Sequence, residues 1–251
     1  MNMLKKILSS IGIGSAKVDT KLFKTNFIPG ELLEGVVEIQ GGKVEQSIDE
    51  IYLSVFCNYT IESDNGNYES NAILGKYKLL DSLVINPNET KSIPFSFSIP
   101  NDVPITTGKT NVWLQTGLDI NMAIDPQDRD YIEIQPHPLV NAFLQSVKSL
   151  GFRLRKTEAK KAPGYLRGRL PFAQEFEFKP TSGPFRGRLD ELEAVFFIFE
   201  NRVDVILQVD RKGGFLAEKF DMDESHVRFS YDKSDVPRLK ELLSDLIYKY
   251  S

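Results

Sequence analysis

Hydrophobic and polar residues alternate along most of the chain between Lys17 and Pro136, which is the period-two pattern of half-buried β-strands. Turn-forming residues separate the alternating segments, as in PGE, GG, NPNET and PNDVP. Several short antiparallel strands of this kind are typical of a β-sandwich. The pattern predicts strands at 18–23, 32–40, 47–59, 76–84, 91–99, 110–120 and 131–134.

The pattern changes at QPHPLVNAFLQSVKSLG, where two prolines flank His137. Apolar residues then recur at helical spacing as far as Gly151, which occupies the position of a helix C-cap. We therefore place a domain boundary here and predict an N-terminal domain over 1–136 and a C-terminal domain over 137–251. The first helix of the second domain is expected at 139–150.

The second domain continues with strand-like segments and ends in a second amphipathic helix. Strands are predicted at 152–156, 172–178, 192–199 and 203–210. Pro237 suits the first turn of a helix at 235–249, whose apolar residues form one face. The pattern predicts an all-β chain with an antiparallel β-sandwich in the first domain and a mostly β second domain, together with a short N-terminal helix, a helix after the linker and a C-terminal helix.

Composition fits a globular protein with real cores, because 41% of the 251 residues are hydrophobic and 11% are aromatic. A formal net charge of -4 argues against a general nucleic-acid binder, so no nucleic-acid partner is expected. The single cysteine, Cys57, excludes an intramolecular disulfide and lies in an alternating segment that predicts burial. The absence of disulfides fits a cytoplasmic location.

The N-terminal segment MNMLKKILSSIGIGSA has apolar residues at helical spacing beside Lys5 and Lys6. Serines and glycines interrupt the apolar run, so we expect the segment to be retained rather than removed as a signal peptide. A short helix that packs on the body or on a partner is the favoured interpretation. Peripheral attachment to a membrane surface is the alternative.

No catalytic, cofactor-binding or metal-binding residue is predicted. GKT at 108–110 lacks the upstream glycine of a phosphate-binding loop and precedes a strand rather than a helix. The acidic segment DPQDRD at 125–130 has Pro126 and Arg129 where a calcium loop would need other residues. His137 lies between two prolines in the linker and His226 in a strand-like segment, so neither indicates an imidazole arranged to activate a nucleophile. Two distant carboxylates that act as acid and base, as in a carbohydrate-active β-sandwich enzyme, remain an alternative.

One stretch departs from the acidic balance of the chain. Between Lys148 and Arg169 many cations accompany a single acid, Glu158, and a second Gly/Pro-rich stretch adds two arginines. This asymmetry indicates either a surface for a phosphate-bearing or acidic partner or a solvated loop. The candidate partner-facing basic patch consists of Lys160, Lys161, Arg167, Arg169, Arg186 and Arg188.

Several long blocks of the sequence resemble one family. KVDTKLFKTNFIPGELLEGVVEIQGG is similar to the opening of arrestin-like domains. GIGSAKVDT, FIPGE, GVVEIQGG, GLDINMAIDPQDRDYIEI and LPFAQEFEFKPTSGPFRGRLDELE resemble, in this order, the SpoOM-type sporulation-control family of bacteria. The resemblance spans nearly the whole chain.

The resemblance implies two arrestin-like β-sandwiches in a cytoplasmic, non-enzymatic regulator that acts at entry into sporulation, as a scaffold or adaptor for protein partners. Some arrestins hold their domains together with buried opposite charges near the hinge. We therefore expect inter-domain ion pairs between groups before and after the linker. The candidates are Asp125, Asp128, Arg129 and Asp130 before the linker, and Arg153 and Arg155 after it.

Exposed strand edges or helices offer a second mode of interaction, by which the chain could bind a partner or form a homodimer. Two alternatives to the cytoplasmic adaptor stay open at this point. One is a peripheral adaptor at the membrane or septum, held by the N-terminal segment and the basic stretch. The other is the carbohydrate-active enzyme.

Overall fold

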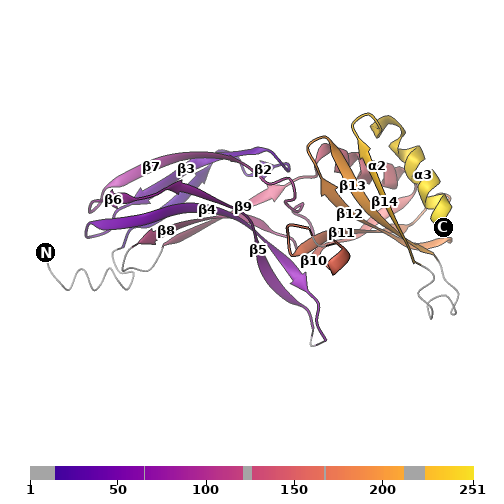
Figure 1. Ribbon diagram of the computed structural model, residues 1–251, viewed down its shortest axis with the longest axis horizontal. Helices are drawn as coiled ribbons and strands as arrows, with labels where there is room; N and C mark the ends of the chain where they lie inside the picture. The colour runs from indigo at the N-terminus through magenta and orange to yellow at the C-terminus, as the bar shows by residue number, and fades with distance from the viewer. Residues whose placement is uncertain (1–14, 65, 121–125, 167, 212–223) are drawn as a thin grey trace. The chain divides into compact units, whose positions relative to one another are not determined.

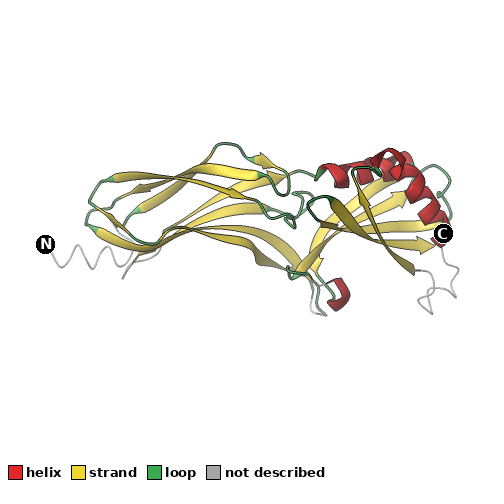
Figure 2. Ribbon diagram, turned by 45° about the horizontal axis from the view of Figure 1, so that its top comes forward, coloured by secondary structure: helices red, strands yellow, loops and turns green. Residues whose placement is uncertain are grey.

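The computed structural model (Figure 1) describes residues 15–64, 66–120, 126–166, 168–211 and 224–251. Strands predominate, and the helices α2 and α3 both follow the first nine strands along the chain (Figure 2). The expected N-terminal helix falls within residues 1–14, which lie outside the described residues.

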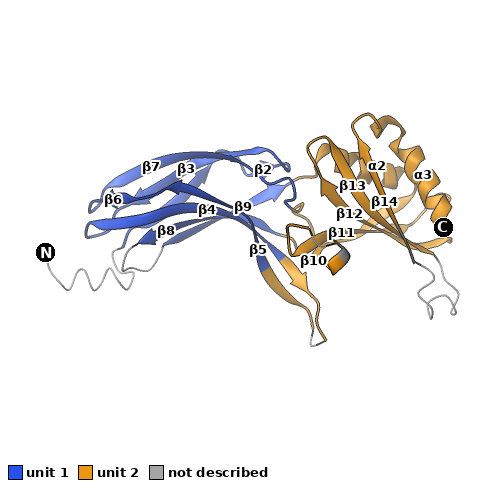
Figure 3. Cartoon of the chain, in the orientation of Figure 1, with its two compact units in different colours: residues 1–58, 71–103, 111–134 blue, residues 59–70, 104–110, 135–251 orange. Residues whose placement is uncertain are grey.

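The chain forms two compact units (Figure 3). Unit 1 comprises residues 1–58, 71–103 and 111–134, and unit 2 comprises residues 59–70, 104–110 and 135–251. A single boundary at 136 was expected from the sequence, whereas two short segments from the first half of the chain also belong to unit 2.

Unit 1 is built on two sheets. One sheet has the strand order β1-β3-β7, and in the other β4 pairs with β8, β8 with β9, and β9 with β2, while β5 and β6 both pair with β4. The strands are β1 (Lys17–Leu22), β2 (Asn26–Phe27), β3 (Leu32–Gln40), β4 (Gln46–Ile61), β5 (Tyr68–Leu80), β6 (Leu83–Ile85), β7 (Thr90–Ser98), β8 (Val112–Ile120) and β9 (Gln127–Ile134).

The alternating pattern explains which side of each strand is buried. In β3, Leu33, Val37 and Ile39 are fully buried, while Leu32 and Glu34 are exposed. β3 and β7 pair without interruption from Leu32↔Ser98 to Gln40↔Thr90, so their inward-facing positions stay aligned. The period-two positions of the sequence therefore supply the core between the layers of unit 1.

The glycines of FIPGELLEGVVEIQGG lie at turns and along a strand rather than at the start of a helix. Gly30 has φ +82° in the turn between β2 and β3, where its amide donates to Ile99 O at 3.1 Å. In the same turn, Glu31 N donates to Ile28 O at 3.1 Å. A phosphate cradle requires a helix N-terminus, so this stretch has an architectural role.

Unit 2 contains an antiparallel meander whose strand order is β14-β13-β12-β11-β10. The strands are β10 (Phe152–Lys161), β11 (Phe172–Pro180), β12 (Leu189–Ile198), β13 (Arg202–Arg211) and β14 (Glu224–Asp232). The end of β4 adds a parallel pair, Thr60↔Lys160, beside β10. Short 3-10 turns occur at Gly164–Leu166 and Val236–Arg238.

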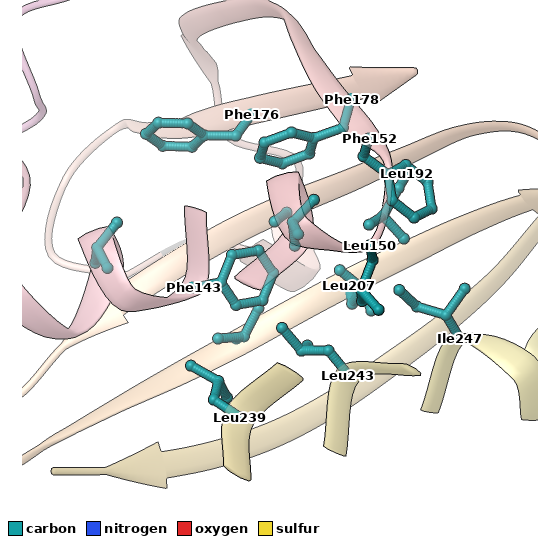
Figure 4. Packing of buried hydrophobic residues seen from close by; sticks show 14 of the residues in the cluster. Phe143, Leu150, Phe152, Phe176, Phe178, Leu192, Leu207, Leu239, Leu243 and Ile247 are labelled. Carbon is teal, nitrogen blue, oxygen red and sulfur yellow. The ribbon is translucent and has the colours of Figure 1, made fainter. Parts of the chain in front are cut away.

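Two helices, α2 (Pro138–Ser149) and α3 (Leu239–Tyr250), cover one face of this meander. Their apolar faces pack with alternate residues of the strands into one core (Figure 4). Tyr231 of β14 adds a buried hydrogen bond from its hydroxyl to Leu139 O at 2.9 Å. Core residues include Val140, Phe143 and Val147 of α2, Leu239, Leu243 and Ile247 of α3, and Phe176, Phe178, Leu192 and Leu207 of the sheet.

This arrangement differs from the second sandwich expected from the sequence. In the described part of unit 2, the layer opposite the meander consists of α2 and α3 rather than a second sheet. The physical reason is that two amphipathic helices supply the apolar surface that a second sheet would otherwise provide.

The ends of the helices follow local chemistry. His137 caps α2, because its Nδ1 accepts a hydrogen bond from Leu139 N at 3.3 Å. Gly151, with φ +94°, follows the C-terminus of α2 and donates its amide to Lys148 O, as a C-capping glycine does. The sequence placed the C-terminal helix at 235–249, but the regular helix begins at Leu239, because the residues around Pro237 form a 3-10 turn.

Candidate interaction surfaces

The predicted hinge residues that precede the linker lie on β9 of unit 1. Asp128 Oδ2 accepts a hydrogen bond from Thr20 N at 2.6 Å. The Arg129 guanidinium lies 4.8 Å from the centroid of the Trp113 ring. These contacts tie β9 to neighbouring strands of the same unit.

Asp130 lies beside two other carboxylates. Burial, together with Asp128 and Asp19, raises the pKa of Asp130 to about 6. Asp125 lies outside the described residues. Asp128 and Asp130 of this strand therefore repel each other near neutral pH.

The two hinge candidates that follow the linker lie on β10 of unit 2. Arg155 occupies an irregularity in the pairing of β10 with β11 and forms an ion pair with Glu177. Arg153 is exposed and lies opposite Lys179 in the register. Ion pairs between the units remain a prediction.

The candidate basic patch is distributed over two places in unit 2. Lys160, Lys161 and Arg169 lie where β10 ends and the chain leads into β11, whereas Arg186 and Arg188 lie in the turn after β11. A nine-residue strand such as β11 spans about 30 Å, so the two groups are well separated. Arg167 lies outside the described residues. A partner-facing role remains a prediction for each group separately.

Opposite α2 and α3, the meander presents a surface of alternating charges, which we call the charged face. Cross-strand partners share one side of a sheet, and the register pairs Lys156 with Glu177, Glu158 with Glu175, and Glu177 with Glu193. The charged face consists of Lys156, Glu158 and Lys160 of β10, Glu175, Glu177 and Lys179 of β11, and Glu191 and Glu193 of β12.

Ion pairs neutralise much of the charged face. Lys160 Nζ lies 3.3 Å from Glu175 Oε2 and 3.6 Å from Glu62 Oε1. Lys179 Nζ lies 2.8 Å from Glu191 Oε2. Lys160, which the sequence assigned to a basic patch, is therefore surrounded by carboxylates.

Glu193 has a different environment. Within the described residues its side chain forms neither an ion pair nor a hydrogen bond, although it is half-buried, and Lys160 exerts only a weaker attraction on it. Burial and the nearby carboxylates of Glu175, Glu191 and Glu177 raise the pKa of Glu193 to about 7. A cation placed beside Glu193 would relieve this repulsion, so the carboxylate can accept a positively charged group.

A small apolar cluster adjoins Glu193 on the same side of the sheet. Val195 is buried together with Ala162, Leu166 and Ala173, and Phe197 packs partly buried against them. Protein interfaces combine an apolar centre with a polar rim, and the partly exposed Phe197 beside the charged face offers both kinds of group.

The residues considered for chemistry have structural roles. Burial raises the pKa of the Cys57 thiol, which keeps it protonated and unreactive. Burial lowers the pKa of His137, the cap of α2. Within the described residues, no group of three or more His, Cys, Asp or Glu side chains is arranged to hold a metal ion. None of the helices in that part of the chain is long and apolar enough to cross a membrane.

The acidic half of the charged face was not identified from the sequence. Glu175, Glu177 and Lys179 alternate with phenylalanines along β11, and Glu191 and Glu193 do so with apolar residues along β12. This alternation is visible in the sequence, but only the pairing of the strands shows that the carboxylates converge.

Comparisons with known proteins agree over nearly the whole chain. The family model described as SpoOM protein matches residues 4–213. The sporulation-control protein Spo0M of Bacillus subtilis (strain 168) is 40% identical over 258 residues, which cover 100% of this chain and 100% of that protein. The crystal structure of Spo0M from Bacillus subtilis matches with a TM-score of 0.87 at 39% identity, covering 95% of this chain and 100% of the other.

Proposed function

Because the chain belongs to the SpoOM family of sporulation-control proteins, we propose that it controls sporulation as a non-enzymatic adaptor in the cytoplasm. In this proposal the chain binds protein partners and acts as an arrestin-like adaptor, as the resemblance in its sequence implies. The alternative of a membrane-associated adaptor depends chiefly on residues 1–14, which lie outside the described residues.

The observation that supports the proposal most strongly is the environment of Glu193. This half-buried carboxylate lies among Glu175, Glu177 and Glu191 without a paired cation in the described part of the chain. A partner that inserts a lysine or arginine there would gain a charge-assisted contact and remove the repulsion. The partner is therefore expected to present a basic side chain, next to an apolar group that contacts the partly exposed Phe197.

The test is capture of partners by crosslinking from cells entering sporulation, with wild type compared with Glu193→Lys. The new ammonium group would lie among three carboxylates, so we expect the variant to remain folded while it repels a basic partner. The captured protein should be lost or reduced by about tenfold or more. Glu241→Lys on the exposed surface of α3 is the matched control, with the same charge change on the same unit.

Equal capture by Glu193→Lys and by the control would contradict the role of the charged face. Circular dichroism of both purified variants establishes that they are folded before the comparison is made.

A carbohydrate-active enzyme is the second candidate, because a carboxylate with a raised pKa is also what a general acid requires. Release of reducing sugars from a polysaccharide by the purified protein, abolished in Glu193→Gln, would favour this candidate over the adaptor.

A further inference from the structure

Within the described residues, strand β14 is the terminal strand of the unit 2 meander, and it lacks proline and lysine, two residues that commonly protect such an edge against pairing with another strand. Edge strands are commonly protected by proline, lysine, bulges or short length. Among the other terminal strands of the described sheets, β1 has Lys17 and Lys21, β7 has Lys91 and Pro94, and β2 has two residues. β14 has nine residues with no proline or lysine, and its register with β13 is uninterrupted.

The direction of the backbone groups of β14 follows from the β12–β13 turn. Phe199 N donates to Arg202 O at 2.9 Å, so the backbone groups of Arg202 point toward β12. Backbone groups alternate in direction along a strand, so the odd-numbered residues of β13 and β14 bond to each other. The even-numbered residues of β14, including Ser230, therefore point their backbone N–H and C=O groups away from β13. Asp232 agrees, because its amide also points away from β13, where it donates to the Asp235 side chain at 3.2 Å and so takes no part in pairing with another strand.

We propose that this edge binds the β14 strand of a second copy of the chain, antiparallel, with Ser230 facing Ser230 of the second copy. In this register Arg228 lies opposite Asp232 of the second copy on the exposed side. Phe229 lies opposite Tyr231 of the second copy on the side that faces the helices. The symmetry axis repeats each contact, which gives two Arg–Asp pairs, whereas Tyr231 is already buried in its own core and adds no new aromatic contact.

Charge selects this register over a neighbouring one. A pairing centred on Arg228 would place two arginines face to face, and like charges directly opposite are destabilising. The Ser230-centred register instead pairs opposite charges. The contact is a short strand pair, so the dimer should be weak and form at micromolar concentrations.

Dimerisation would also bring two charged faces together, and this part of the proposal rests on the proposed adaptor function. An antiparallel pair of β14 strands joins two meanders into one sheet, and a two-fold axis perpendicular to that sheet leaves both charged faces on the same side. Two linked sites bind a multivalent partner more tightly than one.

Sedimentation velocity of the full chain from about 1 to about 200 µM tests the proposal, with Ser230→Pro compared with Ser230→Ala. Proline at position 230 removes the amide that points away from β13, and no hydrogen bond to β13 is lost. Alanine at the same position keeps this amide. Wild type and Ser230→Ala should dimerise alike, and Ser230→Pro should dimerise about tenfold more weakly or not at all. A wild type that is monomeric throughout, or equal dimerisation of the two variants, would overturn the proposal.

A charge exchange tests the register and covers the case in which the proline variant does not fold. Arg228→Asp should weaken the dimer, because two carboxylates then face each other, and the double variant Arg228→Asp/Asp232→Arg should restore it. Failure of the double variant to exceed the single variant would contradict the Ser230-centred register. A monomeric wild type that still captures partners through Glu193 would refute the dimer alone, whereas a dimer that captures none would refute the adaptor alone.

Discussion

Glu193 acquires its properties from residues on other segments of the chain. The sequence indicates only that it alternates with apolar residues along a strand. Its nearest charged neighbours on β11, Glu175 and Glu177, are brought beside it by strand pairing, and burial adds to their effect on its pKa. Cys57 is the opposite case, because its alternating neighbours predicted its burial and the structure confirms it.

Glu193→Gln should stabilise the protein at pH 8 and have little effect at pH 5. The pKa in the folded state is about 7, above the ordinary value of 4.5, so ionisation costs stability at high pH and that cost disappears as pH falls through this window. Allowing for partial solvent exposure, we expect a gain of roughly 1–2 kcal/mol in the free energy of unfolding at pH 8.

Urea unfolding at the two pH values measures this difference. Glu241→Gln on α3 serves as the control and should change little at either pH. A gain of the same size at pH 5 and pH 8 would show that repulsion at Glu193 is not its cause.

At the scale of elements, strands with clear alternation were the most predictable. β3 has the predicted bounds, whereas the first half of β5 and the end of β10 were missed. The first half of β5 exposes polar side chains, and the end of β10 carries polar and charged residues that are partly buried, so both resemble a loop when the paired strand is unknown. Gly151 was placed correctly at the end of α2, because a glycine after an apolar helical face is a strong local signal.

Gly151→Ala should destabilise the protein by about 2–3 kcal/mol. Gly151 has φ +94°, and a Cβ atom there would lie 2.2 Å from Ser182 O, a backbone atom that cannot easily move. Gly187→Ala is the matched control, because its φ is +83° but nothing lies within 4 Å of the added Cβ. The control should cost only about 1 kcal/mol from the backbone conformation.

Denaturant unfolding of the two variants gives both values. Equal losses would mean that the contact with Ser182 contributes nothing beyond the left-handed backbone conformation.

At the scale of the whole molecule, the sequence supported the family and the two-part organisation better than the details of assembly. Long blocks in the same order as in the SpoOM family identified it, and the comparisons confirm this. The sequence did not predict that α2 and α3 form the layer opposite the unit 2 meander. Two amphipathic helices can either pack on the outside of a β-sandwich or take the place of one of its sheets, and the sequence does not distinguish the two. The charged face could not be predicted either, since it combines three strands.

Complementation of a strain that lacks the gene tests the central claim most directly. Wild type, Glu193→Lys and the control Glu241→Lys are expressed at equal levels, and heat-resistant spores are counted. An adaptor that acts through the charged face predicts that Glu193→Lys gives the spore count of the deletion strain, while the control gives that of wild type. A wild-type spore count with Glu193→Lys would contradict the account.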